Sequence, residues 1–425
     1  MKRTITTRPI CWTLLAVLAA AALPSLLGMA LAAEEAAPAK AETDWPHWRG
    51  PGRDAISPET DWKADWAGRA KDAWHHDVGE GYSAVSVRDG LAVTMGFAGG
   101  KDTVWAFDAA TGERKWQYSY PSSRGNQYHG PRGTPAMTDK FVFTHSVAGL
   151  VHGLDISDGK KVWSVSMPKQ YKAKAGSWGF AGSPLLLGDR VIIDAGVVVA
   201  FDQATGKEVW KSEHFPAGYS TPAVFQRDGK TYLACFNAYG LVILDAADGK
   251  TLGTLRWQTA HNVNAATPIV EGEKVFISSG YGKGCALVDM SGSELRTVYT
   301  NKNMANHFNT CVLVDGYLYG FSGQAGGRGR LVCMKMADGK VAWSQRDRAM
   351  GTGSLIVAGD RMIVQGERGV LMTLKFDNKG VKGLARAQAL KGICWTMPVL
   401  ANDRIYVRSS KGLVRCYDVS KDASE

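Results

Sequence analysis

The chain has 425 residues, 45% of them hydrophobic and 21% charged, an ordinary globular composition that excludes collagen, coiled coil and disorder along the whole length. Its 50 Lys and Arg against 40 Asp and Glu give a formal net charge of +10, with the two signs interspersed along the sequence. Because a nucleic-acid interface needs cations clustered on one face, we expect no nucleic-acid partner.

The first segment, residues 1–32, has the pattern of an export signal peptide. Lys2, Arg3 and Arg8 precede an apolar run over 11–31, and Ala30-Leu31-Ala32 offers a small-x-small cleavage site. The run is also long enough to span a bilayer, so an uncleaved membrane anchor remains the alternative. We therefore expect a periplasmic or secreted protein with no membrane span after cleavage, or a membrane-anchored one if the signal is retained.

Residues 33–72 are predicted to form a spacer and an N-terminal strap. The stretch 45–51 in this segment has two interpretations. Trp45 and Trp48 could pin the strap against the folded domain, or, together with Arg49, they could form a binding clamp. Residues 421–425 are expected to be a short tail.

Between these ends the sequence repeats a unit of 41–47 residues. Each copy contains an apolar run, an Asp and a Thr-Gly or Asp-Gly turn, as in 106–112, 153–159, 200–206 and 243–249, often followed by a Trp four residues after the Gly. Asp-Gly turns between β-rich runs are typical of hairpins. Four antiparallel strands repeated at this period predict a β-propeller.

Eight strand starts can be counted, near Ser83 and seven later positions. The eighth unit ends at Asp418, after its third strand, while the segment around Trp74 matches a fourth strand. We therefore predict an all-β, eight-bladed propeller over residues 73–420, its last blade completed by an N-terminal strand. Closure of the ring would remove the exposed sheet edges of an open array. The recurring Trp residues are expected to lie between blades, and the blades lacking one should have softer interfaces.

The repeat resembles the pyrroloquinoline-quinone-type (PQQ-like) propeller repeat, on the strings 155–163 and 202–210. The segments 44–51 and 306–309 are similar to exported PQQ-like propellers of planctomycete-type bacteria, and the chain is more distantly similar to the BamB propellers. The resemblance implies the fold over most of the chain and says little about function.

Some members of the PQQ-like group are quinoprotein alcohol dehydrogenases, and the resemblance makes such an oxidoreductase the alternative function. Those enzymes resemble one another in an adjacent-cysteine disulfide, a Ca²⁺ ion and an Asp base. This sequence has no Cys-Cys pair, and its recurring Asp residues fit turns better than calcium ligands. We therefore predict no cofactor, with PQQ and calcium as the alternative, and no catalytic residue. The question of enzymatic activity stays open, leaning towards none.

A binding site is predicted where the loops entering the first strand of each blade meet at the central channel. These loops carry aromatic and polar residues that the repeat itself does not require. The candidate ligand- or partner-binding residues are Tyr128, His129, Arg132, Trp178, Tyr219, His261, Asn264, His307, Asn309 and Trp395. Rings supply stacking area while Asn and His supply directional hydrogen bonds. The alternative is that they satisfy loop backbone groups and fill the channel. A metal site is not expected, because the three His lie in different repeats.

The favoured function is thus an exported, non-catalytic binding or protein-interaction scaffold of the cell envelope. Its expected partner is an envelope or exported protein, or a saccharide. A structural part of an envelope assembly complex is a third possibility that the sequence leaves open.

Overall fold

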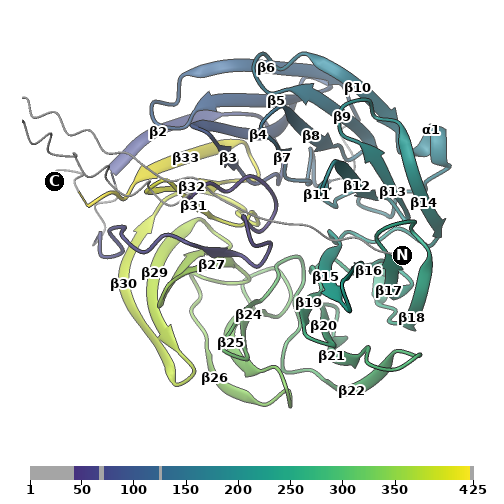
Figure 1. Ribbon diagram of the computed structural model, residues 1–425. Coiled ribbons are helices and arrows are strands. Elements are labelled where there is room, and N and C mark those ends of the chain that lie inside the picture. The colour runs from purple at the N-terminus through teal and green to yellow at the C-terminus, as the bar shows by residue number, and fades with distance from the viewer. Residues whose placement is uncertain (1–42, 67–70, 124–126, 422–425) are drawn as a thin grey trace, which may run out of the picture. The chain divides into compact units, whose positions relative to one another are not determined.

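The chain forms eight separate β-sheets arranged as a ring, as seen in the computed structural model (Figure 1). The structure describes residues 43–66, 71–123 and 127–421. The predicted signal peptide lies outside these residues, as does most of the predicted tail. All eight sheets belong to one unit, residues 41–425.

The first four blades follow one another without interruption along the chain. Their strands are β3 (Ser86–Arg88), β4 (Leu91–Ala98), β5 (Lys101–Asp108) and β6 (Arg114–Pro121); β7 (Ala136–Met137), β8 (Phe141–His145), β9 (Leu150–Asp155) and β10 (Lys161–Ser166); β11 (Leu185–Leu187), β12 (Arg190–Asp194), β13 (Val197–Asp202) and β14 (Glu208–His214); β15 (Ala223–Arg227), β16 (Lys230–Phe236), β17 (Gly240–Asp245) and β18 (Thr251–Arg256).

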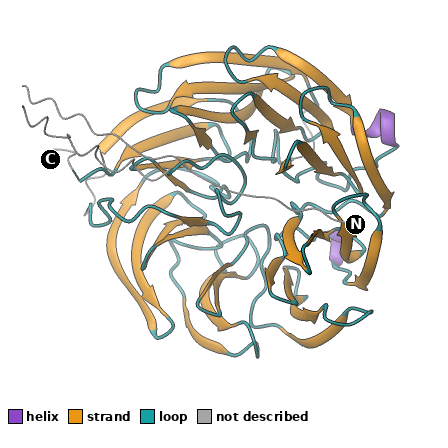
Figure 2. Cartoon of the chain, viewed as in Figure 1, coloured by secondary structure: helices purple, strands orange, loops and turns teal. Residues whose placement is uncertain are grey.

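The last four blades include both strands that come from the N-terminal part of the chain. Their strands are β19 (Ile269–Glu271), β20 (Lys274–Ser279), β21 (Gly284–Asp289) and β22 (Arg296–Asn301); β23 (Val312–Val314), β24 (Tyr317–Ser322), β25 (Arg330–Lys335) and β26 (Val341–Gln345); β27 (Ser354–Ala358), β28 (Arg361–Gln365), β29 (Val370–Asp377) and β30 (Gly380–Gln388), with β1 (Ile56–Ser57); and β31 (Val399–Ala401), β32 (Arg404–Arg408) and β33 (Leu413–Asp418), with β2 (Lys71–Asp77). The helices described are α1 (Met167–Tyr171) and the 3₁₀ turn η1 (Ala260–Asn262). Figure 2 shows how completely strands dominate.

The predicted all-β, eight-bladed propeller is confirmed, and so is its closure. Strand β2 pairs antiparallel with β33, and Trp74 lies opposite Cys416. The Trp74 indole also donates to the carbonyl of Ala109 in the first blade, 3.1 Å away. Arg408 joins the same two blades from inside, because its buried guanidinium donates to the carbonyls of Ser83 and Gly79, both at 2.9 Å. The N-terminal strand therefore makes the last blade part of a continuous ring.

The recurring Asp residues end their strands as turn caps. The Asp108 carboxylate accepts hydrogen bonds from the backbone N–H of Ala110 and Thr111, at 3.0 and 2.9 Å. Asp202 makes the same turn, and the hydroxyl and N–H of Thr205 lower its pKa. These bonds are those of an Asx-type turn, so the repeated carboxylates serve the hairpins.

The recurring Trp side chains lie between neighbouring blades. Trp163 donates from Nε1 to the carbonyl of Gln203 in the next blade, at 2.8 Å. Its ring covers Gly206, where an added Cβ would come within 2.5 Å of ring carbons. The turn glycine is therefore required twice, for its positive φ and for the space that the ring occupies.

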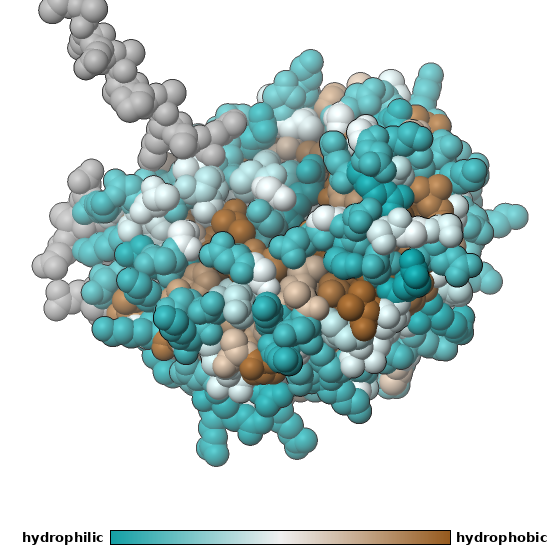
Figure 3. Space-filling view, turned by 60° about the horizontal axis from the view of Figure 1, so that its bottom comes forward, coloured by the Kyte–Doolittle hydropathy of each residue, from teal (hydrophilic) through white to brown (hydrophobic). Residues whose placement is uncertain are grey.

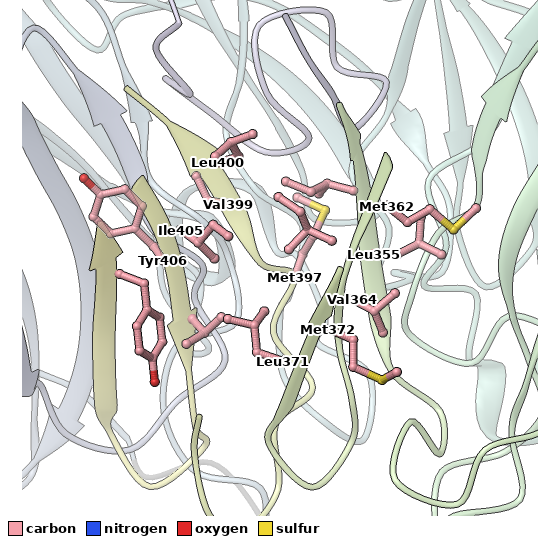
Figure 4. Packing of buried hydrophobic residues seen from close by; sticks show 14 of the residues in the cluster. Leu355, Met362, Val364, Leu371, Met372, Met397, Val399, Leu400, Ile405 and Tyr406 are labelled. Carbon is pink, nitrogen blue, oxygen red and sulfur yellow. The ribbon is translucent and has the colours of Figure 1, made fainter. Parts of the chain in front are cut away.

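Two of the three blades without this Trp fill the interface with other residues. In the fifth blade, Tyr299 donates to the carbonyl of Met336 at 2.7 Å. Beside the seventh blade, Trp62 and Trp66 are buried, and Ala64 between them accepts a hydrogen bond from Thr373. Figure 4 shows the side chains of the seventh and eighth blades that pack together in this part of the core.

The N-terminal strap crosses the central channel of the propeller. We use the name channel strap for residues 43–57. Trp45 exchanges two backbone hydrogen bonds with Val87 in the first blade, both 2.9 Å, and its ring is fully buried. At the other end of the strap, β1 pairs in parallel with β27 of the seventh blade. The channel strap therefore lies beside the inner strands and holds them to one another.

Among the residues described, no helix has the length and apolar character needed to cross a membrane. On the face drawn in Figure 3, hydrophobic residues form small patches between larger hydrophilic areas. The exposed large aliphatic residues are mostly on outermost strands, one per blade in the second to sixth blades. The buried apolar residues form clusters that span neighbouring blades, as between the first and second and between the second and third.

Candidate functional site

A cavity with a volume of about 900 Å³ lies at one end of the central channel. Loops that lead into the first strand of a blade supply most of its wall, and the loops β20–β21, β24–β25 and β28–β29 also contribute to it. Trp48 of the channel strap also lines it, held by a 3.0 Å hydrogen bond from its Nε1 to the hydroxyl of Thr267. The strap thus contributes an aromatic wall on the inner side.

An almost continuous chain of rings surrounds this cavity. Each ring centroid lies 4.7–6.0 Å from the next, in the order Tyr82, Trp395, Phe308, His307, Tyr281, His261, Trp178 and Tyr219. Such edge-to-face and tilted contacts stabilise aromatic clusters. We call the cavity with these eight rings the aromatic cup.

The charges in the cup are mostly positive. Among its lining residues, Arg132, Arg368 and Lys391 are basic, whereas Glu367 is acidic. Arg132 lies 5.9 Å from the centroid of the Tyr82 ring and donates to the carbonyl of Tyr128 at 2.6 Å. An anionic or electron-rich ligand would therefore meet a favourable field.

Glu367 has a structural role in the cup. Its carboxylate accepts hydrogen bonds from the backbone N–H of Gly326 and Gly327, at 2.7 and 2.8 Å, and from the Trp395 indole at 3.2 Å. These bonds place the glycine-rich β24–β25 loop and the Trp395 ring at the wall of the cavity. Burial lowers the pKa of the nearby His307 to about 4. That imidazole is therefore neutral at neutral pH.

The structure brings six of the ten candidate residues into the cavity wall: Tyr128, Arg132, Trp178, Tyr219, His307 and Trp395. His261 joins the chain of rings, between Trp178 and Tyr281, although it is not among the lining residues. His129 instead faces Glu80, with 2.6 Å between its Nδ1 and a carboxylate oxygen.

Asn264 and Asn309 are buried beneath the loops. The Asn264 amide donates to the carbonyls of Asn237 and Trp257, at 2.7 and 2.9 Å. The Asn309 amide donates to the carbonyl of Gly353 at 2.9 Å. Both amides therefore bond to loop backbone. This agrees with the alternative interpretation, in which candidate residues satisfy loop backbone groups.

Sequence reasoning did not select Tyr281, Gln324 or Glu367 as site residues. They lie in loops between second and third strands, whereas the predicted site consisted of loops that enter first strands. Phe308 follows the candidate residue His307, and nothing in the sequence distinguished it as a site residue. The sequence did indicate a role for Trp48 of the channel strap. The position of Trp48 under the cup, however, depends on where the strap crosses the channel.

A calcium-bound quinone would need several oxygen ligands for its metal ion. No three His, Cys, Asp or Glu side chains among the residues described converge as metal ligands. Glu367, the carboxylate in the cup wall, already accepts hydrogen bonds from backbone and indole N–H groups. Cys235, Cys285, Cys311, Cys333, Cys394 and Cys416 are all buried free thiols.

Comparison with known proteins places the chain in a family. The family model described as outer membrane protein assembly factor BamB matches residues 62–177, 101–326 and 320–382. The chain belongs to this family. Among curated relatives, BamB of Escherichia coli (strain K12) is 26% identical over 321 residues, covering 72% of this chain and 78% of that protein. The BamB-like resemblance expected from the repeat is thus confirmed.

Solved structures show the shared fold. The crystal structure of BamB from Moraxella catarrhalis superposes with a TM-score of 0.55 at 17% identity, covering 83% of this chain and all (100%) of that one. Quinohemoprotein alcohol dehydrogenase ADH-IIG of Pseudomonas putida superposes with a TM-score of 0.66 at 14% identity, covering 90% and 81%. Its sequence is 28% identical over 167 residues, 35% of this chain and 22% of that enzyme. Propellers of both functional kinds therefore share this architecture.

Proposed function

We propose that this protein is a non-catalytic binding module of the cell envelope, which holds a segment of an exported or envelope protein in the aromatic cup. The observation that carries the proposal is the chain of eight rings around an open cavity of about 900 Å³. A cavity of this size is within the range of ligand sites. Stacking surface combined with few polar groups suits side chains of an extended segment.

Two further observations support a protein partner in the envelope. The BamB relatives are named for outer membrane protein assembly, which is a protein-interaction function. The sequence pattern of residues 1–32 predicts export. Together they favour a periplasmic site of action for the cup.

The test is affinity capture with the mature protein and with a cup variant, W178A/W395A. Both rings are wall residues, and Trp178 packs against Tyr219 at 6.0 Å. We expect envelope proteins captured by the wild type to be lost from this variant. W343A is the matched control, because Trp343 lies on the outer strand β26, away from the cup. Capture of the same proteins by all three forms would refute the proposal. If the wild type and W178A/W395A captured the same proteins but only the wild type bound a saccharide, the cup would be assigned to a sugar.

The quinoprotein alternative has a separate test. PQQ and Ca²⁺ are added to the mature protein, which is then passed through a desalting column. Because the donor set does not fit calcium, we expect no absorbance from PQQ to remain with the protein. Stoichiometric retention, with dye reduction in the presence of an alcohol, would replace the binding proposal by an oxidoreductase.

A further inference from the structure

A second cavity of about 300 Å³ lies between the channel strap and the inner strands of neighbouring blades. Its blade-side wall is formed around the prolines that open three consecutive blades, Pro184, Pro222 and Pro268, and includes mainly aliphatic side chains. We call this cavity the strap pocket. It is distinct from the aromatic cup, although Trp48 and Thr221 line both.

The strap pocket occupies the sector that the channel strap leaves open. In the described part of the chain, the strap makes hydrogen bonds to the inner strand or its adjoining loop in every blade except the fourth. Residues 221–224 of that blade line the pocket instead. The strap pocket therefore lies where the channel strap makes no hydrogen bond to the fourth blade.

The strap side of the pocket is cationic and incompletely bonded. Arg49 is 3% exposed, and its guanidinium donates only to carbonyls, those of Arg53, Asp54 and Cys311, at 2.8–3.1 Å. Its Nη1 has no hydrogen-bond partner, nor has Nε of Arg53 or Nδ1 of His47. A buried charge with an unmade hydrogen bond is costly.

The carboxylate nearest to these groups compensates them only in part. Asp54 lines the same pocket, but it is exposed, and its Oδ1 accepts a hydrogen bond from the N–H of Ile56 at 2.9 Å. Two guanidinium groups and one carboxylate thus line the pocket. Burial, together with the charge of Arg53, lowers the pKa of His47 to about 4, so that ring is neutral and can donate one hydrogen bond.

We propose that the strap pocket binds an aliphatic carboxylate, whose charge pairs with Arg49 and Arg53 and whose hydrocarbon part lies along the blade-side wall. A guanidinium is the group that pairs best with a carboxylate, through two parallel hydrogen bonds. Leu185, Val224 and Ile269 belong to that wall, and they favour an apolar body over a small inorganic anion. Gly52 and Asp54 at the pocket are exposed, which leaves a route from solvent.

The same chemistry has two sources, a free short-chain fatty acid or the C-terminal carboxylate of an apolar peptide. Hexanoate serves as the first probe and a pentapeptide ending in Leu, as free acid and as amide, serves as the second. Binding of hexanoate alone assigns the pocket to a small molecule, whereas tighter binding of the peptide acid assigns it to a protein C-terminus.

The experiment is calorimetric titration of the mature protein with hexanoate and with the uncharged isostere hexanamide. We expect hexanoate to bind at least about tenfold more tightly, as for other charge-assisted hydrogen bonds. R53Q should weaken hexanoate about tenfold and leave hexanamide unchanged. R227Q is the matched control, because Arg227 also donates to a backbone carbonyl, that of Met290, but lies outside the pocket.

Equal binding of acid and amide by the wild type would overturn the proposal, as would the absence of binding. This comparison needs no substitution, so it holds even if R53Q fails to fold. Inorganic phosphate binding as tightly as hexanoate would overturn the assignment to an aliphatic ligand. The strap pocket does not depend on the proposed function of the cup, and W178A/W395A should retain hexanoate binding.

Discussion

The interblade Trp of the second blade provides the sharpest test of how the ring is held together. Trp163 is 8% exposed, and its ring lies against the turn of the third blade. W163A removes this ring from the interface and leaves the carbonyl of Gln203 without its 2.8 Å hydrogen bond. Truncation of a buried Trp costs about 3–5 kcal/mol, and about 1 kcal/mol of that comes from the hydrogen bond.

The free energy of unfolding is measured by urea titration, followed by far-UV circular dichroism. W163F retains most of the ring contacts and should lose about 1–2 kcal/mol, chiefly through the unpaired carbonyl. W343A should cost less than W163A, because Trp343 is only half-buried although it makes the equivalent 2.9 Å bond to Asp377. If W163A cost under about 1 kcal/mol, or no more than W343A, the packing argument would be refuted.

Three further predictions concern the strap, a buried acid and the thiols. W45A should lower the free energy of unfolding by about 3 kcal/mol or more in urea, since the ring is fully buried; a change under about 1 kcal/mol would contradict a holding role for the strap. Burial raises the pKa of Asp102 to about 6, so the folded state retains a proton that the unfolded state releases. The contribution of Asp102 to stability, measured as the difference between wild type and D102N, should therefore fall by about 3 kcal/mol as the pH rises from about 4 through about 6. The difference is needed because the lowered pKa values of buried His47 and His307 act on stability with the opposite sign in the same range. A difference in stability between the two proteins that did not change with pH would disprove this shift. Burial also raises the pKa of Cys285 to about 11 and of Cys416 to about 12. Iodoacetamide should therefore modify these thiols at neutral pH only after unfolding, and no reductant should be needed because they are free thiols. Rapid labelling of the native protein would contradict their burial.

Much of the candidate site could be predicted from the repeat, because the repeat fixes which loops meet at the channel. Trp178 and Trp395 stood out since the hairpins do not need an aromatic residue there. The repeat could not separate wall residues from supporting ones: Asn264 and Trp178 have the same kind of position in the sequence, yet the amide turns inward to Asn237. Such a choice depends on the neighbouring blade, which lies far away in the sequence.

The expectation of softer interfaces shows the same limit. The fourth, fifth and seventh blades lack the Trp, and the sequence predicts softer interfaces at these positions. Tyr299 occupies one such interface through its hydroxyl, and Trp62 and Trp66 lie beside another. The latter pair comes from a segment outside the repeats, so no pattern within the repeat could have located it.

The sequence by itself determined the number of blades, the strand order within each and the closure by residues around Trp74, because local turns and alternating burial recur in every copy. It did not determine the path of residues 43–57, which have no repeating pattern. Only the tertiary structure showed Trp48 under the aromatic cup and Arg49 buried beside the strap pocket. The strap makes its hydrogen bonds to residues as distant as Asn402, and contacts of that separation leave no local signal in the chain.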